Sequence, residues 1–117
     1  MMTGLLTFKI TRELRLHASV RLVLDWLCEH SQFGNSVTDW TQQDIAEDCG
    51  LYRPRVSAIL HELEHHRLIL VRGRGIATLN PYLWYRGKID EQQEACERWD
   101  QYQRARGEAS GPVVVAK

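Results

Sequence analysis

The sequence has few of the features that mark secreted, disulfide-rich or membrane proteins. Its 117 residues include three cysteines, Cys28, Cys49 and Cys96, an odd number at wide spacing that fits neither a disulfide framework nor a zinc ribbon. The longest apolar runs, residues 68–71 and 113–115, are far shorter than the roughly 20 residues of a membrane span. No basic segment followed by an apolar stretch opens the chain, so we expect no signal peptide. These absences favour a reducing, cytoplasmic location.

An excess of one charge is also missing. Fifteen Lys+Arg residues balance fifteen Asp+Glu residues, which as a bulk number argues against a basic tail and an acidic solvating chain. The balance is not local, because residues 51–88 hold seven basic and two acidic side chains while both flanks are acidic. Neutrality therefore excludes only a diffuse, chain-wide attraction to a polyanion. With 44% hydrophobic residues and enough length for one core, we expect a single globular domain.

Hydrophobic periodicity predicts a first helix over residues 17–30. Apolar side chains recur there at steps of three and four residues, and charged side chains occupy the opposite face. Before this helix, residues 5–10 form either a short strand or part of an N-terminal arm. After it, residues 36–40 are rich in β-formers and predict one short strand.

Two further helices follow in close succession. Thr41 can cap the first of them, with Asp44 near its positive end, and Gly50 ends it. The second begins near Pro54, which suits the first helical position because its missing N–H costs nothing there. It presents apolar side chains on one face and runs to about His66.

A hairpin follows these helices. The apolar runs 68–71 and 76–79 flank Arg72-Gly73-Arg74-Gly75, which predicts two strands joined by a glycine-permitted turn. Asn80-Pro81 ends the second strand. The elements together predict a mainly α fold with a small β-hairpin, of the α+β class.

The last predicted element is a polar helix over residues 89–106. Cys96, Trp99 and Tyr102 form a narrow apolar stripe on it at three-residue steps. The stripe has two interpretations, a contact with a second copy of the chain or packing on its own domain. Residues 107–117 are small and contain Gly and Pro, so we expect a flexible tail.

The pair of helices within residues 41–67 carries the strongest functional signal. Ala46 lets two helices approach closely, and Gly50, four residues later, permits the turn between them. Val56 and Ile59, ten and thirteen residues after Ala46, fill the small core between crossed helices. This spacing is that of a DNA-binding helix-turn-helix, and the hairpin after it makes the pattern a winged helix-turn-helix.

On these positions the chain resembles the winged-helix regulators of the MarR-like kind over residues 15–88. The resemblance implies a DNA-binding domain there, with an arm or strand over residues 1–14 before it. A finer resemblance follows the wing, where Asn80-Pro81-Tyr82-Leu83-Trp84-Tyr85-Arg86-Gly87-Lys88 is similar to the end of plasmid replication initiators of the RepL type. The chain departs from the usual pattern at Tyr52, where a Ser or Thr is common.

The chemistry of this segment agrees with DNA binding. A helix in the major groove contacts DNA through its first turns, and an arginine there can hold guanine through two parallel hydrogen bonds. Arg72 and Arg74 at the wing tip suit phosphates or an adjacent minor groove. An isolated surface arginine is usually only solvated, but four of them gather at the helix start and the wing. The candidate DNA-binding residues are Thr41, Gln42, Tyr52, Arg53, Pro54, Arg55, Ser57, Ala58, His61, Arg72 and Arg74.

The same helix contains a rival motif. His61-Glu62-Leu63-Glu64-His65 reads as H-E-x-x-H, the signature of zinc proteases. Charged Glu64 and Arg67 stand where those enzymes carry uncharged and apolar residues, and no clear third ligand follows. We therefore predict no metal site, no cofactor and no catalytic site. The histidines at this helix end, His66 included, are better explained by the C-terminal helix dipole.

Three functions follow from these patterns. The leading one is a sequence-specific transcriptional regulator, most simply a repressor, and the second is a plasmid or phage replication initiator. The third is a winged helix used only for protein contacts, in which Arg53, Arg55, Arg72 and Arg74 are dispensable. The expected partners are double-stranded DNA and a second copy of the chain, because winged helices of this size generally bind as two-fold dimers. We expect neither a membrane nor a small-molecule substrate as a partner.

Overall fold

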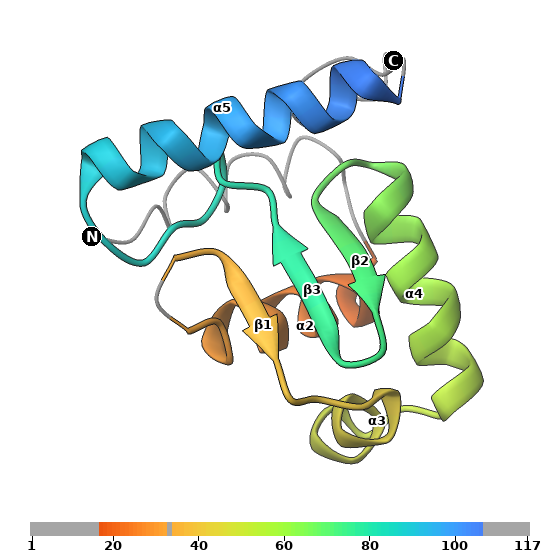
Figure 1. The fold of residues 1–117 in the computed structure, drawn as a ribbon. Coiled ribbons are helices and arrows are strands. Elements are labelled where there is room, and N and C mark those ends of the chain that lie inside the picture. Colours follow the sequence, from red (N-terminus) through yellow and green to blue (C-terminus); the bar gives the residue numbers. More distant parts are fainter. Residues whose placement is uncertain (1–16, 33, 107–117) are drawn as a thin grey trace.

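Over the residues that the computed structural model describes, 17–32 and 34–106, the chain forms four helices and one three-stranded antiparallel sheet (Figure 1). In chain order the elements are α2 (Ala18–Glu29), β1 (Ser36–Thr38), α3 (Gln42–Cys49), α4 (Arg53–His65), β2 (Ile69–Gly73), β3 (Ile76–Leu79) and α5 (Ile89–Ala105). This architecture confirms the predicted α+β class. The predicted arm over residues 1–14 and tail over residues 107–117 lie outside the described residues. Each of the four helices is too short or too polar to cross a membrane.

The sheet joins the predicted hairpin to the strand that precedes the helix pair. Its order is β1-β3-β2, with Val37 of β1 opposite Ala77 and Ile69 of β2 opposite Leu79 of β3. β1 stops at Thr38, earlier than predicted, because Asp39 takes a left-handed backbone with a φ of 59°. β1 is therefore a third strand beside the β2–β3 hairpin, and it precedes α3 in the chain.

The caps of the two central helices explain their close succession. Thr41 Oγ1 accepts the Asp44 amide N–H at 3.1 Å, while the Asp44 carboxylate accepts the Thr41 N–H at 2.8 Å. This reciprocal box satisfies two donors at the start of α3, and Gly50 ends the helix with a φ of 66°. The sequence predicted Pro54 as the first helical residue. In the structure α4 begins at Arg53, so Pro54 is the second.

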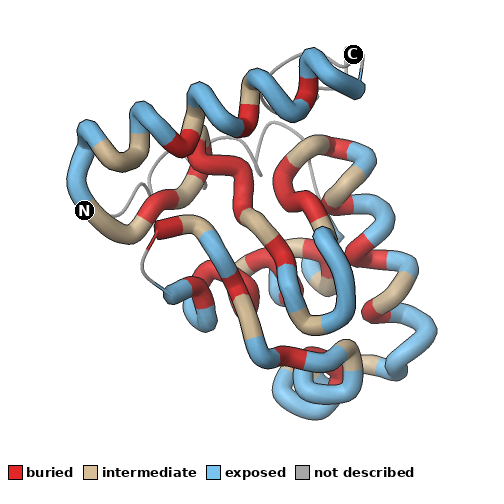
Figure 2. Tube along the Cα trace, in the orientation of Figure 1, coloured by how far each residue is buried: buried red, intermediate tan, exposed pale blue. Residues whose placement is uncertain are grey.

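The hydrophobic core lies between α2, α3, α4 and the sheet. In Figure 2 buried positions recur along α4 between exposed ones, as expected for a helix with one face against a core. Fully burying an aliphatic side chain stabilises the fold by about 1.5–3 kcal/mol. The core side chains nearest the helix pair are Val20, Val23 and Leu27 of α2, Ile45 and Ala46 of α3, and Val56, Ile59, Leu60 and Leu63 of α4.

The apolar stripe of α5 differs from the prediction. Trp99 is buried as expected, but its buried neighbours are Ala95 and Gln103 at four-residue steps, whereas Cys96 is only half-buried and Tyr102 is 38% exposed. The predicted and the buried stripe are both centred on Trp99, so they lie on the same side of the helix and differ in the residues that flank Trp99.

Two hydrogen bonds hold α5 on the segment that follows β3. Tyr82 Oη donates to Asp100 Oδ2 at 2.6 Å, and Gln92 Nε2 donates to the Pro81 carbonyl at 2.8 Å. The hydrogen bond to Asp100, with a smaller contribution from burial, raises the pKa of Tyr82 to about 12. These contacts favour the second interpretation of the stripe, in which α5 packs on its own domain.

The wing turn is tighter than predicted and rests on the segment before α3. The ladder between β2 and β3 is irregular at Val71–Gly73, β2 continues to Gly73, and only Arg74 and Gly75 form the turn. Gly75 has a φ of +65°, and a Cβ there would lie 2.7 Å from the Trp40 carbonyl oxygen. Gly75 thus lets the wing approach the start of the helix pair.

We expect Gly75→Ala to lower the free energy of unfolding by about 1–3 kcal/mol, because it adds both a left-handed strain and a backbone clash. Gly73→Ala is the matched control, since its Cβ would meet nothing within 4 Å. That control should stay within about 0.5 kcal/mol of the unmodified chain. Urea denaturation followed by tryptophan fluorescence measures both. Equal losses in the two variants would show that Gly75 does not set the position of the wing.

Candidate nucleic-acid interface

The first turn of α4 separates three successive residues onto different sides of the helix. Successive residues of an α-helix are rotated by about 100° from one another. Since Val56 and Leu60 face the core, Arg53 and Arg55 lie on opposite edges of the buried stripe. Pro54, between them, points away from the core and is exposed.

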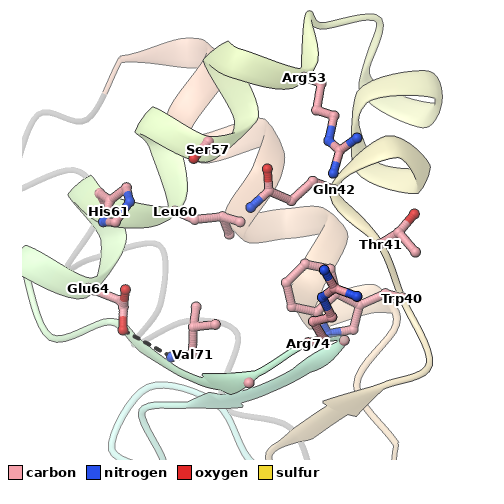
Figure 3. Close-up of a pocket in the computed structure, with 12 residues that line it drawn as sticks. Trp40, Thr41, Gln42, Arg53, Ser57, Leu60, His61, Glu64, Val71 and Arg74 are labelled. Atoms are coloured by element: carbon pink, nitrogen blue, oxygen red, sulfur yellow. Dashed lines mark hydrogen bonds between the residues drawn. The ribbon is translucent and has the colours of Figure 1, made fainter.

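A cleft of about 510 Å³ lies between α4 and the wing. Its lining includes the apolar side chains of Trp40, Leu60 and Val71, and Figure 3 shows Arg53 pointing into it from the start of α4. Arg74, at the wing turn, lies beside Trp40 in the same view. Six of the eleven predicted DNA-binding residues line this cleft: Thr41, Gln42, Arg53, Ser57, His61 and Arg74.

Glu64 also lines this cleft, and its carboxylate stabilises the fold. Its Oε2 accepts the backbone N–H of Val71 at 3.1 Å, as the dashed line in Figure 3 marks. The contact ties α4 to β2 where the ladder becomes irregular. From the sequence, Glu64 was assigned only to the rival metal motif. Its spacing from Arg53 and Ser57, eleven and seven residues, already placed the three on one helix face.

Arg55 lies on the other edge of α4, next to α2. Its Nη2 donates to Ser19 Oγ at 2.9 Å, and Ser19 also approaches His17 Nδ1 at 2.9 Å. The start of α2 therefore lies beside the start of α4. Sequence reasoning missed Ser19, because it lies 36 residues from Arg55 and no local pattern links the two.

Arg72 does not point into the cleft. Side chains alternate along a strand, so Arg72 faces the side of β2 opposite to Val71. Its Cζ lies 5.2 Å from the centroid of the Tyr102 ring, and Arg106 approaches the same ring at 5.6 Å. Arg72 therefore contacts α5 in this structure, and its binding to DNA stays a prediction.

The remaining predicted residues lie on the exposed outer surface of α4 and just before it. Tyr52 is 86% exposed and makes no capping hydrogen bond through its side chain. Pro54 and Ala58 are exposed as well, four residues apart on the same face. None of these three lines the cleft, which leaves them facing solvent beside it.

The histidines of the rival motif lie on the same exposed side. His61 and His65 are exposed, one helical turn apart, while His66 is buried at the C-cap with its ring 5.3 Å from that of His65. Within residues 17–32 and 34–106, no group of three His, Cys, Asp or Glu side chains is placed to hold a metal ion.

The cysteines carry no activated thiol. Burial raises the pKa of Cys28 to about 12, and burial also raises the pKa of Cys49 and of Cys96. Near neutral pH each side chain is therefore a protonated thiol, whereas nucleophilic attack and metal binding both require the thiolate.

Acidic side chains gather on the far side of α3 from the cleft. Asp44, Glu47 and Asp48 line a separate concavity there together with Trp26, whose Nε1 donates to Asp48 Oδ2 at 2.8 Å. The Trp26 ring also stacks on His30 with 3.8 Å between ring centroids. Basic and acidic groups are thus separated by α3. A polyanion is attracted to the side formed by α4 and the wing and repelled from the other.

Comparison with known proteins gives one match. Residues 20–82 match the Crp-like helix-turn-helix domain, more than half of the chain. The matched range begins within α2 and ends just after β3, so it includes α3, α4 and the wing but not α5. No curated protein and no solved structure matches the chain.

Proposed function

Because the chain belongs to the Crp-like helix-turn-helix domain family, which supports sequence-specific DNA binding, we propose that it is a transcriptional repressor with α4 as its reading helix. The observation that carries the proposal is the placement of guanidinium groups on both edges of the first turn of α4 and at the wing turn. A major groove about 12 Å wide admits one α-helix, and its two walls are the phosphate backbones. Groups on the two helix edges are therefore the ones that face phosphates.

One backbone follows the cleft between α4 and the wing. Arg53 and Arg74 line it from opposite elements, and Ser57 adds a hydroxyl between them. Guanidinium groups bind phosphate oxygens through charge-assisted hydrogen bonds, which fix the register of a protein on the duplex. Trp40 and Leu60 give this cleft an apolar floor that suits the sugar part of the backbone.

The other backbone lies at the junction of α4 and α2. Arg55 and Ser19 are already hydrogen-bonded there, at exposed positions close to the N-terminal end of α2. The positive dipole end of a helix favours an anion. The bond to Ser19 thus holds Arg55 on the side of α4 where the second phosphate backbone would lie.

The proposal includes two copies bound to one operator, since a helix-turn-helix dimer reads two half-sites about one helical turn apart. The buried residues of α5, Ala95, Trp99 and Gln103, pack against their own chain. The outer side of the helix is charged, with Glu94, Glu97 and Arg98 exposed. We therefore do not assign the contact between the copies to the predicted stripe.

A replication initiator is the second candidate, and it depends on the resemblance of residues 80–88 to the RepL type. Asn80 in this segment has a structural role, because its Nδ2 donates to the Arg67 carbonyl at 2.7 Å and its Oδ1 accepts the Tyr82 N–H at 2.9 Å. Trp84 likewise donates to Ser31 Oγ at 2.8 Å. These bonds give Asn80 and Trp84 a role in holding the fold, which accounts for both residues without an initiator function.

Footprinting on the DNA that neighbours the gene separates these two functions. We expect protection over a promoter, because a repressor acts by occupying the site where transcription begins. Protection confined to a replication origin, with no promoter in it, would favour the initiator instead.

We expect the logarithm of DNA affinity to fall linearly with the logarithm of salt concentration, because bound phosphates release counterions. Arg53→Ala together with Arg74→Ala should reduce the magnitude of that slope by about 2, or roughly 0.9 for each lost phosphate contact. Fluorescence anisotropy with a labelled duplex across a salt series measures the slope.

Arg98→Ala together with Arg104→Ala on α5 is the matched control, since it removes the same two charges from exposed positions outside the cleft. It should leave the slope nearly unchanged. If the cleft variant and the control have equal slopes, the phosphate assignment is wrong. If the unmodified chain does not bind duplex DNA at all, a winged helix used only for protein contacts becomes the better explanation.

A further inference from the structure

The face of α4 that points away from the core carries no lysine or arginine. Pro54 and Ala58 are the outward positions of its first two turns, and both are exposed. They are four residues apart and therefore lie one above the other on the same face. In the first two turns this surface consists of a pyrrolidine ring and a methyl group, with the exposed ring of Tyr52 just before it. The exposed imidazole of His61 follows on the same side, seven residues after Pro54 and about 10.5 Å further along the helix axis.

The arginines near this face are directed elsewhere. Arg53 points into the cleft, Arg55 is hydrogen-bonded to Ser19 on α2, and Arg72 lies against Tyr102. The usual partner of guanine, a guanidinium opposite O6 and N7, is therefore missing from the centre of the reading face. Guanidinium groups lie at its edges, where phosphates are the nearest acceptors.

An apolar surface in the major groove has one natural partner among the bases. Thymine alone presents a methyl group there, at C5, and small apolar side chains contact it. Pro54 and Ala58 project only a short distance, which allows the helix backbone to approach the base edges closely. A guanine or cytosine in the same place presents only polar groups to these side chains and offers no methyl group for an apolar contact.

We propose that the chain recognises an A·T-rich half-site in which thymine C5-methyl groups contact Pro54 and Ala58. The inference rests on the proposed function, because it requires α4 to enter the major groove. Glu62 lies eight residues after Pro54, about 12 Å further along the helix axis, and so lies beyond the first turns that reach base edges. The direct contacts therefore read thymine methyl groups, and the arginines fix the position of the helix.

The test begins with selection of bound sites from a random duplex library by the full chain. In the selected duplex each thymine is then replaced by uracil, which removes the methyl group and leaves base pairing intact. We expect A·T pairs at the centre of each half-site and a loss of about 4-fold in affinity at each contacted thymine, the value of one buried methyl group.

Two variants connect the methyl contact to α4. Ala58→Gly should remove the uracil penalty at one thymine and leave the other penalties unchanged. Ala58→Arg should shift the selected base at that position from thymine to guanine. Glu62→Ala, at an exposed position of the same helix beyond its first turns, is the matched control and should keep every uracil penalty. Thermal unfolding checks that each variant is folded.

The outcomes distinguish the inference from the function on which it rests. A selected site with G·C pairs at the centre of its half-sites, or uracil substitutions without effect, overturns the thymine proposal and leaves DNA recognition standing. A selection that enriches no sequence overturns both. Uracil penalties that persist in Ala58→Gly also overturn the assignment, because the methyl groups then contact something other than α4.

Discussion

The rotation of α4 about its own axis is the constraint on which the rest of the site depends. Four buried side chains, Val56, Ile59, Leu60 and Leu63, lock one face of the helix against α2 and the sheet. Turning the helix would expose several of them, at about 1.5–3 kcal/mol each. With that face fixed, every other position is fixed as well, so Arg53 is directed to the wing and Arg55 to α2. The division of the first turns of α4 into two basic edges and an apolar outer face is therefore a consequence of core packing.

The wing depends on a second constraint, the close approach between its turn and the segment before α3. Gly75 has room for only a hydrogen where the Trp40 carbonyl passes, and this contact places Arg74 at the cleft opposite Arg53. Glu64 holds the middle of β2 against α4 by accepting the Val71 N–H. The acidic side chains of α3 point away from the cleft. A chain with no net charge thus has a face that attracts a polyanion and another that repels it.

Much of the fold could be predicted from local sequence, because the signals are steric and short in range. Ala46 and Gly50 mark the helix pair, and the glycines of the wing mark the hairpin. The site was predicted less completely. The Arg55–Ser19 bond joins residues 36 apart, and no periodicity reports such a contact. Arg72 was placed in the turn, but β2 is longer than expected and strand alternation directs Arg72 toward α5. The stripe on α5 was predicted with the right central residue, Trp99, but Gln103, one of its buried members, is polar and gives no hydrophobic signal.

The central claim, that duplex DNA meets the two edges of α4 and the wing turn, is tested most directly by amide chemical-shift mapping. The measurement titrates the ¹⁵N-labelled chain with duplex DNA at moderate salt. We expect the largest changes at Ser19, along residues 53–61 and at residues 73–75, with small changes at Asp48 and along the outer side of α5. Largest changes on the acidic side of α3 or on α5, with α4 unaffected, would contradict the account.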